Sequence, residues 1–208
     1  MRPLYISPKQ KINVCVIEKN MSTILTAIIC YLFDSEHNTE VFNKRSCQGR
    51  NELLEFVGDL NNYTNVEGWL HLAVSRDPIE RFVSSFVDKC VIRKRKGTCQ
   101  NCKSNVTCFI ERMHRRMLRY SNDKVRKYKL DESHFYPQNW RCNFSKHFGD
   151  YTIIPFNNSK QLAGHTTGRV ERKKLSRLVR QSPYLIKKLV EIYYYDFVLF
   201  GYEMPKIN

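Results

Sequence analysis

The sequence predicts an α/β fold, a three-layer sandwich around a mostly parallel central sheet. Three short runs rich in apolar and β-branched residues indicate strands: two buried strands at 12–17 (INVCVI) and 69–74 (WLHLAV), and a third strand at 151–156 (YTIIPF). Stretches whose apolar residues are spaced three and four apart alternate with these runs and indicate amphipathic helices. Strands that alternate with helices are typical of a parallel sheet covered by helices.

The first strand leads through a short polar turn into the first predicted helix. Residues 18–21 form the turn, and Ser22 and Thr23 are residue types that favour a helix N-terminus. Apolar residues then recur at helical spacing, at Ile24, Leu25, Ile28, Ile29 and Leu32. Residues 34–66 are polar, and one helix is predicted there at 52–60.

The second strand is followed by a stronger signal for a helix start. Asp77 is an N-cap residue type, Pro78 fits the first helical position, and Glu80 adds an acid to the first turn. The apolar stripe continues through Phe82, Val83, Phe86, Val87 and Cys90. This pattern predicts a helix packed against the core by one face.

The rest of the chain predicts a basic loop and two further helices. Residues 93–108 form the loop, and a basic amphipathic helix follows, carrying Phe109, Ile110, Met113 and Met117. Ser182 and Pro183 begin a last long helix. No linker divides the sequence, so we predict one domain over 1–208, with residues 93–130 as a basic, cysteine-containing insertion.

The composition indicates a folded domain with an anionic partner. The 208 residues include 35 Lys and Arg against 20 Asp and Glu, a formal charge of +15. The 42% of hydrophobic residues suffice for a core, and the 12% of aromatic residues, with the apolar runs, exclude intrinsic disorder. Positive charge concentrates in residues 93–129 and 169–188. Solvated helix faces explain part of this charge, but the excess implies a nucleic acid, an acidic membrane or an acidic glycan as partner.

The cysteines are divided by their surroundings. Cys15 and Cys30 lie in apolar segments and are predicted to be core residues. Six others lie in polar surroundings and are predicted to form disulfides with the pairing left open: Cys47, Cys90, Cys99, Cys102, Cys108 and Cys142. The spacing of Cys99 and Cys102, with His114 nearby, leaves zinc binding as the alternative.

Glycosylation sequons point to the secretory pathway. Five asparagines have Ser or Thr two positions later, against roughly two expected by chance: Asn20, Asn62, Asn105, Asn143 and Asn157. Together with the cysteines they favour an oxidising lumen over the cytosol. Residues 1–11 contain no apolar core of a signal peptide, and the longest apolar run, 24–33, is shorter than a membrane span.

Both strand-to-helix junctions carry residues suited to a phosphate. Main-chain N–H groups converge at a helix N-terminus and favour an anion, and Lys19 adds a positive charge to the first junction. Arg76 offers a planar guanidinium at the second junction. We expect the two strands to be parallel neighbours, with Lys19 and Arg76 facing one cleft. The alternatives are an ordinary capped turn at the first junction and a salt bridge from Arg76 to Asp77 or Glu80 at the second.

Four segments carry a resemblance to a known family. They are 18–23 (EKNMST), 76–84 (RDPIERFVS), 134–138 (HFYPQ) before Cys142, and 196–202 (DFVLFGY). In this order they resemble the motifs of carbohydrate sulfotransferases that use 3′-phosphoadenosine 5′-phosphosulfate (PAPS), in the group with the chondroitin 4-O and HNK-1 enzymes. That family has proline where this chain has Glu18, and glycine where it has Met21.

The resemblance implies a P-loop-like sulfotransferase fold and sulfuryl transfer from PAPS to a glycosaminoglycan hydroxyl. The implied acceptor is chondroitin, sulfated at the 4-hydroxyl of its N-acetylgalactosamine (GalNAc), and the implied location is the Golgi. Lys19 would contact the 5′-phosphate and the bridging oxygen, helped by Asn20, Ser22 and Thr23. Arg76 and Ser84 would hold the 3′-phosphate, and His134 would act as general base. Such a site needs no metal. Family members usually carry an N-terminal membrane anchor, which this sequence does not show.

Alternatives remain open for both the base and the function. His134 could instead be a structural histidine near Trp140, with a carboxylate as the base, whereas His71 is predicted to be a core histidine. A catalytically inactive, glycan-binding relative would follow if Glu18 and Met21 abolish turnover. A basic nucleic-acid-binding domain is the third candidate, and the sequence lacks the motifs of the common RNA- and DNA-binding modules.

Overall fold

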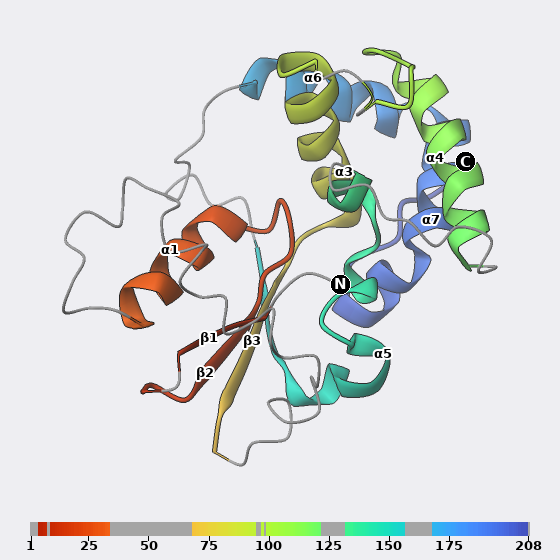
Figure 1. Cartoon of the computed structure of the whole chain (residues 1–208). Helices are drawn as coiled ribbons and strands as arrows, with labels where there is room; N and C mark the ends of the chain where they lie inside the picture. The colour runs from red at the N-terminus through yellow and green to blue at the C-terminus, as the bar shows by residue number, and fades with distance from the viewer. Residues whose placement is uncertain are drawn as a thin grey trace. The chain divides into compact units, whose positions relative to one another are not determined.

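The computed structural model describes residues 4–7, 9–33, 68–94, 97, 99–121, 132–156 and 168–207 (Figure 1). Contacts divide the chain into two compact units. The first comprises Met1–Ser75 and Gln138–Phe156, and the second comprises Arg76–Pro137 and Asn157–Asn208. The helix predicted at 52–60 lies outside the described residues. The single domain expected over 1–208 stays a prediction.

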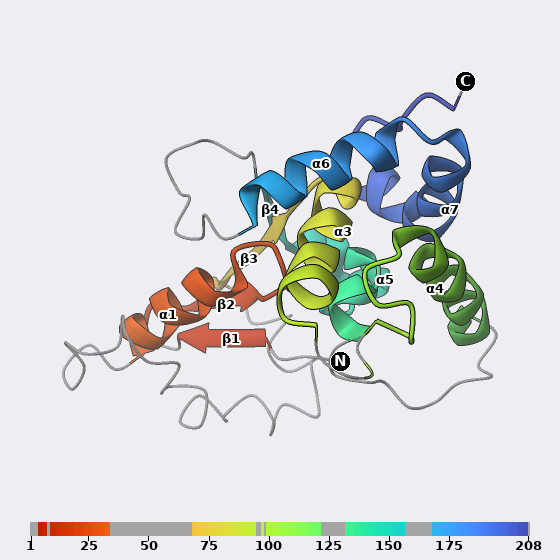
Figure 2. The same cartoon turned by 90° about the horizontal axis from the view of Figure 1, so that it is seen from above.

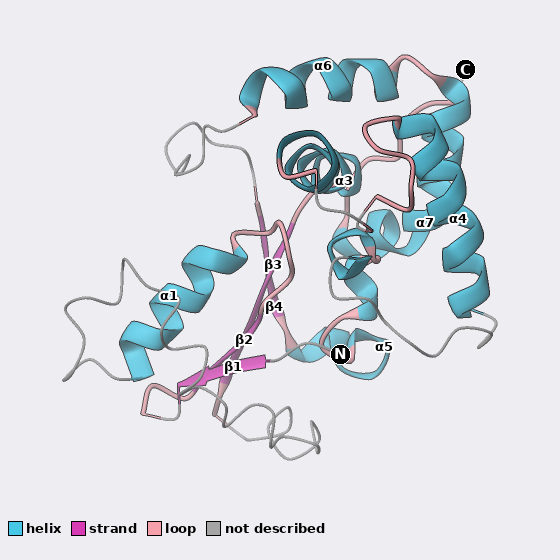
Figure 3. Ribbon diagram, turned by 45° about the horizontal axis from the view of Figure 1, so that its top comes forward, coloured by secondary structure: helices cyan, strands magenta, loops and turns pink. Residues whose placement is uncertain are grey.

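The first unit is built on a four-stranded sheet with the strand order β1-β2-β3-β4 (Figure 3). Its strands are β1 (Leu4–Ser7), β2 (Ile12–Cys15), β3 (Leu70–Ser75) and β4 (Thr152–Pro155). The last three run parallel to one another, whereas β1 is antiparallel to β2. The mixed α/β class with a mostly parallel sheet is therefore confirmed. Strand β1 is an addition to the predicted set.

Burial follows the sequence pattern in β2 and in most of β3, whereas three of the four residues of β4 are exposed within the described part of the chain. In β2, Val14 and Cys15 are almost completely buried, as expected for an apolar strand between two neighbours. Helix α1 (Ser22–Phe33) follows β2 and packs against β1 (Figure 2). Three short turns of helix precede β4: η6 (Gln138–Trp140), α5 (Phe144–His147) and η7 (Phe148–Asp150).

The second unit is helical in its described residues. It contains α3 (Pro78–Phe86), which continues as the π-helical turn η4 (Val87–Ile92), then α4 (Val106–Ser121), η5 (Glu132–Phe135), α6 (Arg169–Arg180) and α7 (Pro183–Phe200). A cluster of phenylalanines forms the centre of its core: Phe82, Phe86, Phe109 and Phe135. The ring centroids of Phe109 and Phe135 lie 4.6 Å apart, which joins α4 to η5.

Both predicted proline helix starts are confirmed. The Asp77 carboxylate accepts a hydrogen bond from the main-chain N–H of Glu80 at 2.8 Å, with Pro78 at the first helical position. The Ser182 hydroxyl accepts from the N–H of Leu185 at 3.4 Å, followed in the same way by Pro183. Such side chains satisfy N–H groups that a helix leaves without an internal acceptor.

Three disulfides join described cysteines. They are Cys15–Cys142 in the first unit, and Cys90–Cys99 and Cys102–Cys108 in the second. The disulfide prediction is confirmed for Cys90, Cys99, Cys102, Cys108 and Cys142, whereas Cys47 lies outside the described residues. The zinc alternative for Cys99 and Cys102 is wrong because both sulfurs are already bonded. The prediction of Cys15 as a core residue is confirmed, because Cys15 is fully buried at the end of β2. Its disulfide to Cys142 is an addition to that prediction.

Candidate active site

The loop between β2 and α1 turns sharply around Lys19. Lys19 and Met21 both adopt left-handed backbone conformations, with φ of 72° and 60°. The main-chain N–H of Asn20 donates to the carbonyl of Ile17 at 3.1 Å, which closes the turn. The next residues, Ser22 and Thr23, begin α1 and are half-buried and exposed respectively. The loop therefore brings a lysine, two hydroxyls and the N-terminus of a twelve-residue helix together.

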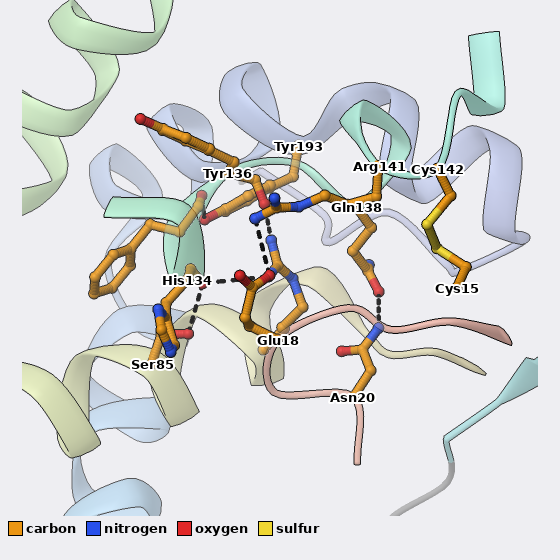
Figure 4. Close-up of polar contacts among 12 residues, drawn as sticks. Cys15, Glu18, Asn20, Ser85, His134, Tyr136, Gln138, Arg141, Cys142 and Tyr193 are labelled. Atoms are coloured by element: carbon orange, nitrogen blue, oxygen red, sulfur yellow. Dashed lines mark hydrogen bonds and ion pairs between the residues drawn. A yellow bond between two sulfur atoms is a disulfide. The ribbon is translucent and has the colours of Figure 1, made fainter. Parts of the chain in front are cut away.

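Asn20 donates hydrogen bonds to acceptors within the protein. It is fully buried, and its side-chain amide nitrogen donates to the carbonyl of Val74 at 2.7 Å and to the Gln138 side-chain oxygen at 2.5 Å (Figure 4). Together with the main-chain bond to Ile17, every N–H group of Asn20 has an acceptor in the protein. The side chain thus fixes the shape of the loop.

Glu18, where the resembled motif has proline, forms a buried ion pair. Its carboxylate lies 2.9 Å from the guanidinium of Arg141, and both side chains are less than a tenth exposed (Figure 4). The negative charge of Glu18 is therefore balanced locally by an arginine of the same unit. The sequence does not predict that Arg141 is the partner of Glu18, because the two residues are far apart along the chain.

Arg76, the first residue after β3, is a buried cation. Burial lowers the pKa of its guanidinium to about 10, partly offset by the negative charge of Glu80, while Arg172 and Arg81 lower it further. The positive charge is thus held where it is poorly solvated. A bound anion would restore the stabilisation that water supplies elsewhere.

The acids that begin α3 have partners on α6. Arg180 lies 3.5 Å from the carboxylate of Asp77 and 3.2 Å from that of Glu80. The hydroxyl of Ser176 also donates to Glu80 at 2.9 Å. Asp77 and Glu80, the two carboxylates considered above as salt-bridge partners of Arg76, are therefore both paired with α6.

The two serines of α3, Ser84 and Ser85, have different surroundings. Ser84 is buried on α3 in the same unit as Arg76. The hydroxyl of Ser85 donates at 2.8 Å to the main-chain carbonyl of His134. Ser85 therefore connects α3 to the segment that carries the candidate base.

His134 lies in η5 on a main chain that is held at three successive carbonyls (Figure 4). The carbonyl of His134 accepts from the guanidinium of Arg81 at 3.2 Å as well as from Ser85. The carbonyl of Phe135 accepts from the Tyr193 hydroxyl at 2.7 Å. The carbonyl of Tyr136 accepts from Arg81 again. These contacts fix the main chain at His134 and with it the point from which the imidazole extends.

The predicted site residues therefore form two groups. The loop after β2 brings Lys19, Asn20, Ser22 and Thr23 together in the first unit. The second unit carries Arg76, Ser84 and His134, and the donors on α3 tie the main chain of His134 to the helix that follows Arg76. The strand prediction is confirmed, since β2 and β3 are parallel neighbours. The single cleft shared by Lys19 and Arg76 stays a prediction.

Several structural partners of these residues were not predicted. Arg81 is 1% exposed, and Gln138 and Arg141 are buried as well. Arg81 and Gln138 fall within the recognised motifs, so the signal for them was present in the sequence. Arg141 and Tyr193 have no such signal, because their partners, Glu18 and Phe135, are far away along the chain.

Basic side chains are exposed on α4 and α6. Those on α4 are Arg112, Arg115 and Arg119, and those on α6 are Arg169, Lys173, Lys174, Arg177 and Arg180. These helices carry part of the two basic stretches, and further described basic residues lie outside them, at Arg93, Lys94, Lys103, Lys187 and Lys188. Among the described residues, no group of His, Cys, Asp or Glu could hold a metal ion. No described helix is long and apolar enough to cross a membrane.

Comparison with known proteins gives consistent matches. The profile described as the sulfotransferase family matches residues 2–161 and 155–203. The protein named carbohydrate sulfotransferase chst-1 of Caenorhabditis elegans is 30% identical over 259 aligned positions, covering 100% of this chain and 77% of that protein. An uncharacterized protein of the same organism is 30% identical over 246 positions, covering 97% of this chain and 69% of its own length. No solved structure matches the chain.

Proposed function

Because this chain belongs to the sulfotransferase family, we propose that it is a carbohydrate O-sulfotransferase that uses PAPS. We propose further that its acceptor is a glycosaminoglycan, namely chondroitin sulfated at the 4-hydroxyl of GalNAc, and that it works in chondroitin sulfate biosynthesis in the Golgi. The observation that carries the donor assignment is the buried guanidinium of Arg76 directly after β3. The carbohydrate assignment is supported by the name of the relative chst-1.

The residues present fit a nucleotide with a 3′-phosphate. Arg76 is buried and its pKa is lowered to about 10, so a dianionic phosphate would compensate a charge that water reaches poorly. Ser84 lies toward the end of α3, the helix that follows Arg76, and adds a hydroxyl donor. Because β2 and β3 are parallel neighbours, the chain leaves both strands at the same edge of the sheet. Open α/β sheets bind their ligands at that edge.

The loop after β2 fits the 5′ end of the same nucleotide. Lys19 supplies a positive charge, and Ser22 and Thr23 supply hydroxyls at the N-terminus of α1. PAPS supplies a sulfuryl group that is activated by its bond to a phosphate. Lys19 neutralises the charge that develops on that phosphate as the bond breaks, so its contribution grows toward the transition state.

His134 is proposed as the general base. Its imidazole accepts the proton of the acceptor hydroxyl while that oxygen forms its bond to sulfur. The carbonyl contacts from Arg81, Ser85 and Tyr193 hold its main chain and thereby limit the orientations of the ring. Positioning and charge neutralisation carry most of the catalysis in the related phosphoryl transfers. The proposed chemistry needs no metal.

The exposed basic helices support an acidic acceptor. α6 presents five exposed Lys and Arg side chains, and the acids nearest to it on α3 are paired with one of them, Arg180. An acidic polysaccharide such as chondroitin matches this surface in charge. The family match favours such a glycan over a nucleic acid.

Disulfides and one exposed sequon support a secretory location. All three described disulfides need an oxidising compartment to form. Asn105 is exposed immediately before α4, whereas the sequon at Asn20 is fully buried. Expression in secretory cells should therefore yield a glycan at Asn105 and none at Asn20. Peptide mapping after glycosidase treatment checks this, and a glycan on Asn20 would contradict the folded loop.

A catalytically inactive relative remains the second candidate because of Met21. Its φ of 60° is a conformation that glycine adopts freely, and the family motif has glycine there. A Met side chain at this position could obstruct the donor. A protein that binds the nucleotide and chondroitin but transfers no sulfate would decide for this candidate.

The donor assignment is tested by titration with adenosine 3′,5′-bisphosphate and, in parallel, adenosine 5′-phosphate. We expect the bisphosphate to bind more tightly, because only it offers the phosphate that Arg76 and Ser84 would contact. Equal affinities for the two nucleotides would contradict the assignment. Transfer of labelled sulfate then separates the active enzyme from its inactive alternative.

A further inference from the structure

Three residues of the segment 138–142 are bonded to the end of β2 and the loop that follows it. Gln138 accepts a hydrogen bond from Asn20, Arg141 pairs with Glu18, and Cys142 is bonded to Cys15. As the segment advances from 138 to 142, its partners descend from 20 to 15. The two stretches therefore run antiparallel and are joined at both ends and in the middle (Figure 4).

All six side chains are buried. Asn20, Gln138 and Cys15 are 0% exposed, and Cys142, Glu18 and Arg141 are between 4% and 6% exposed. An ion pair and a hydrogen bond removed from water are costly to break, and the disulfide adds a covalent constraint. We call the segment 138–142 with these three contacts the strap. The strap fixes the main chain on either side of Lys19.

The loop needs such external support. Lys19 and Met21 are held in left-handed conformations that cost L-residues about 1–2 kcal/mol each. The family motif avoids part of this cost with glycine at the second of these positions and stiffens the first turn with proline. This chain has Glu18 in place of that proline, and the pair with Arg141 provides an attachment that proline lacks.

We propose that Gln138, Arg141 and Cys142 are positioning residues for donor binding, acting on the loop through Asn20, Glu18 and Cys15. The proposal rests on the proposed function, because it assigns the loop to the 5′ end of PAPS. The residues of the strap do not contact the donor in this account: each is engaged with its partner across the strap. Glu18 accordingly raises donor affinity by holding the loop, although its own charge is negative.

The direction in which one substitution changes nucleotide affinity separates this proposal from the alternative that Glu18 repels the donor. If Glu18 repelled the anionic donor, Glu18→Gln would tighten binding of adenosine 3′,5′-bisphosphate. The strap predicts the opposite, a dissociation constant raised about tenfold, by analogy with the loss of side chains that orient metal ligands. Glu191→Gln is the control, because it likewise neutralises an ion-paired carboxylate, in contact with Lys188 and His114 of the second unit. The control should leave the dissociation constant unchanged.

A double-substitution cycle tests whether Arg141 acts through Glu18. Arg141→Gln should weaken nucleotide binding by a similar factor, and the double variant Glu18→Gln with Arg141→Gln should lose little more than either single one. If Arg141 instead contacted the donor, the losses would multiply. Additive losses, or tighter binding by Glu18→Gln, would overturn the proposal.

Hydrogen exchange of residues 16–25 provides a readout that does not depend on the nucleotide. Amides of this loop should exchange faster in Glu18→Gln, and also in Gln138→Met, which keeps the length of the side chain but removes the acceptor for Asn20. Unchanged exchange in both variants would overturn the strap even in a protein that binds the nucleotide. If the two variants exchange faster but the wild-type protein binds no adenosine 3′,5′-bisphosphate, the proposed function is contradicted and the role of the strap is not.

Discussion

The hydroxyl of Tyr193 donates a 2.7 Å hydrogen bond to the main-chain carbonyl of Phe135, the residue after His134. Tyr193 is 1% exposed and interrupts the regular helical backbone of α7, with φ of −109° and ψ of 18°. The guanidinium of Arg81 lies 5.9 Å from the centre of its ring and itself holds the carbonyls of His134 and Tyr136. The kink in α7 therefore coincides with the contact that fixes the segment of the candidate base.

The first prediction concerns this contact. Tyr193→Phe should lower kcat about fivefold, because one hydrogen bond that positions His134 is lost while the aromatic packing stays. The dissociation constant for adenosine 3′,5′-bisphosphate should not change. Steady-state kinetics and calorimetry measure the two quantities. Tyr195→Phe, at a tyrosine that is 63% exposed, is the control. A fall in nucleotide affinity without a fall in kcat would contradict the role given to Tyr193.

The second prediction concerns Arg76. Arg76→Ala should weaken binding of adenosine 3′,5′-bisphosphate by about 1.5–3 kcal/mol, the range of a charged hydrogen bond. Adenosine 5′-phosphate should be affected much less, because it lacks the phosphate that Arg76 contacts. Isothermal titration of both nucleotides checks this, with Arg93→Ala as a control at an exposed, ion-paired arginine. Equal losses for both nucleotides would assign Arg76 a structural role.

The third prediction concerns the backbone at Met21. Met21→Gly should raise the free energy of unfolding by about 0.5–1 kcal/mol, since relief of the left-handed conformation outweighs the extra freedom of glycine in the unfolded chain. Urea denaturation measures this quantity. Met21→Ala removes the same side chain but keeps a Cβ atom, so it should give no such gain. Equal stabilisation by both changes would show that the φ of 60° is not the cause.

The fourth prediction concerns pH. Burial lowers the pKa of His71 below its ordinary value of 6.5, an effect that His147 reinforces and Asp150 opposes. Between pH 7 and pH 5 the unfolded chain then binds more protons than the folded one, so stability should fall with falling pH. His71→Gln should flatten this dependence in urea denaturation. Part of the slope should remain, because burial also lowers the pKa of His114. An unchanged slope would contradict the assignment of His71.

The local features of the fold were predictable because they depend on neighbours in sequence. The apolar runs of β2 and β3 and the cap at Asp77 require only residues within a few positions. His71 is likewise the buried strand residue that its place in an apolar run predicts, at 7% exposure.

The remaining features depend on residues that meet only after folding. Cys15 and Cys142 are 127 positions apart, and no local pattern marks them as partners. The pairing of Glu18 with Arg141 and the bond from Tyr193 to Phe135 have the same origin. The motif residues, among them Arg81 and Gln138, could therefore be named from the sequence, whereas Arg141 and Tyr193, which help to hold them in place, could not.

The most direct test of the proposed activity is transfer of labelled sulfate from PAPS to desulfated chondroitin, with products mapped as disaccharides. We expect the wild-type protein to form GalNAc 4-sulfate. Lys19→Ala should reduce kcat about 10²–10³-fold, with a smaller rise in the KM for PAPS, because Lys19 acts mainly on charge that grows toward the transition state. A folded wild-type protein that binds the nucleotide yet sulfates no glycosaminoglycan would contradict the account.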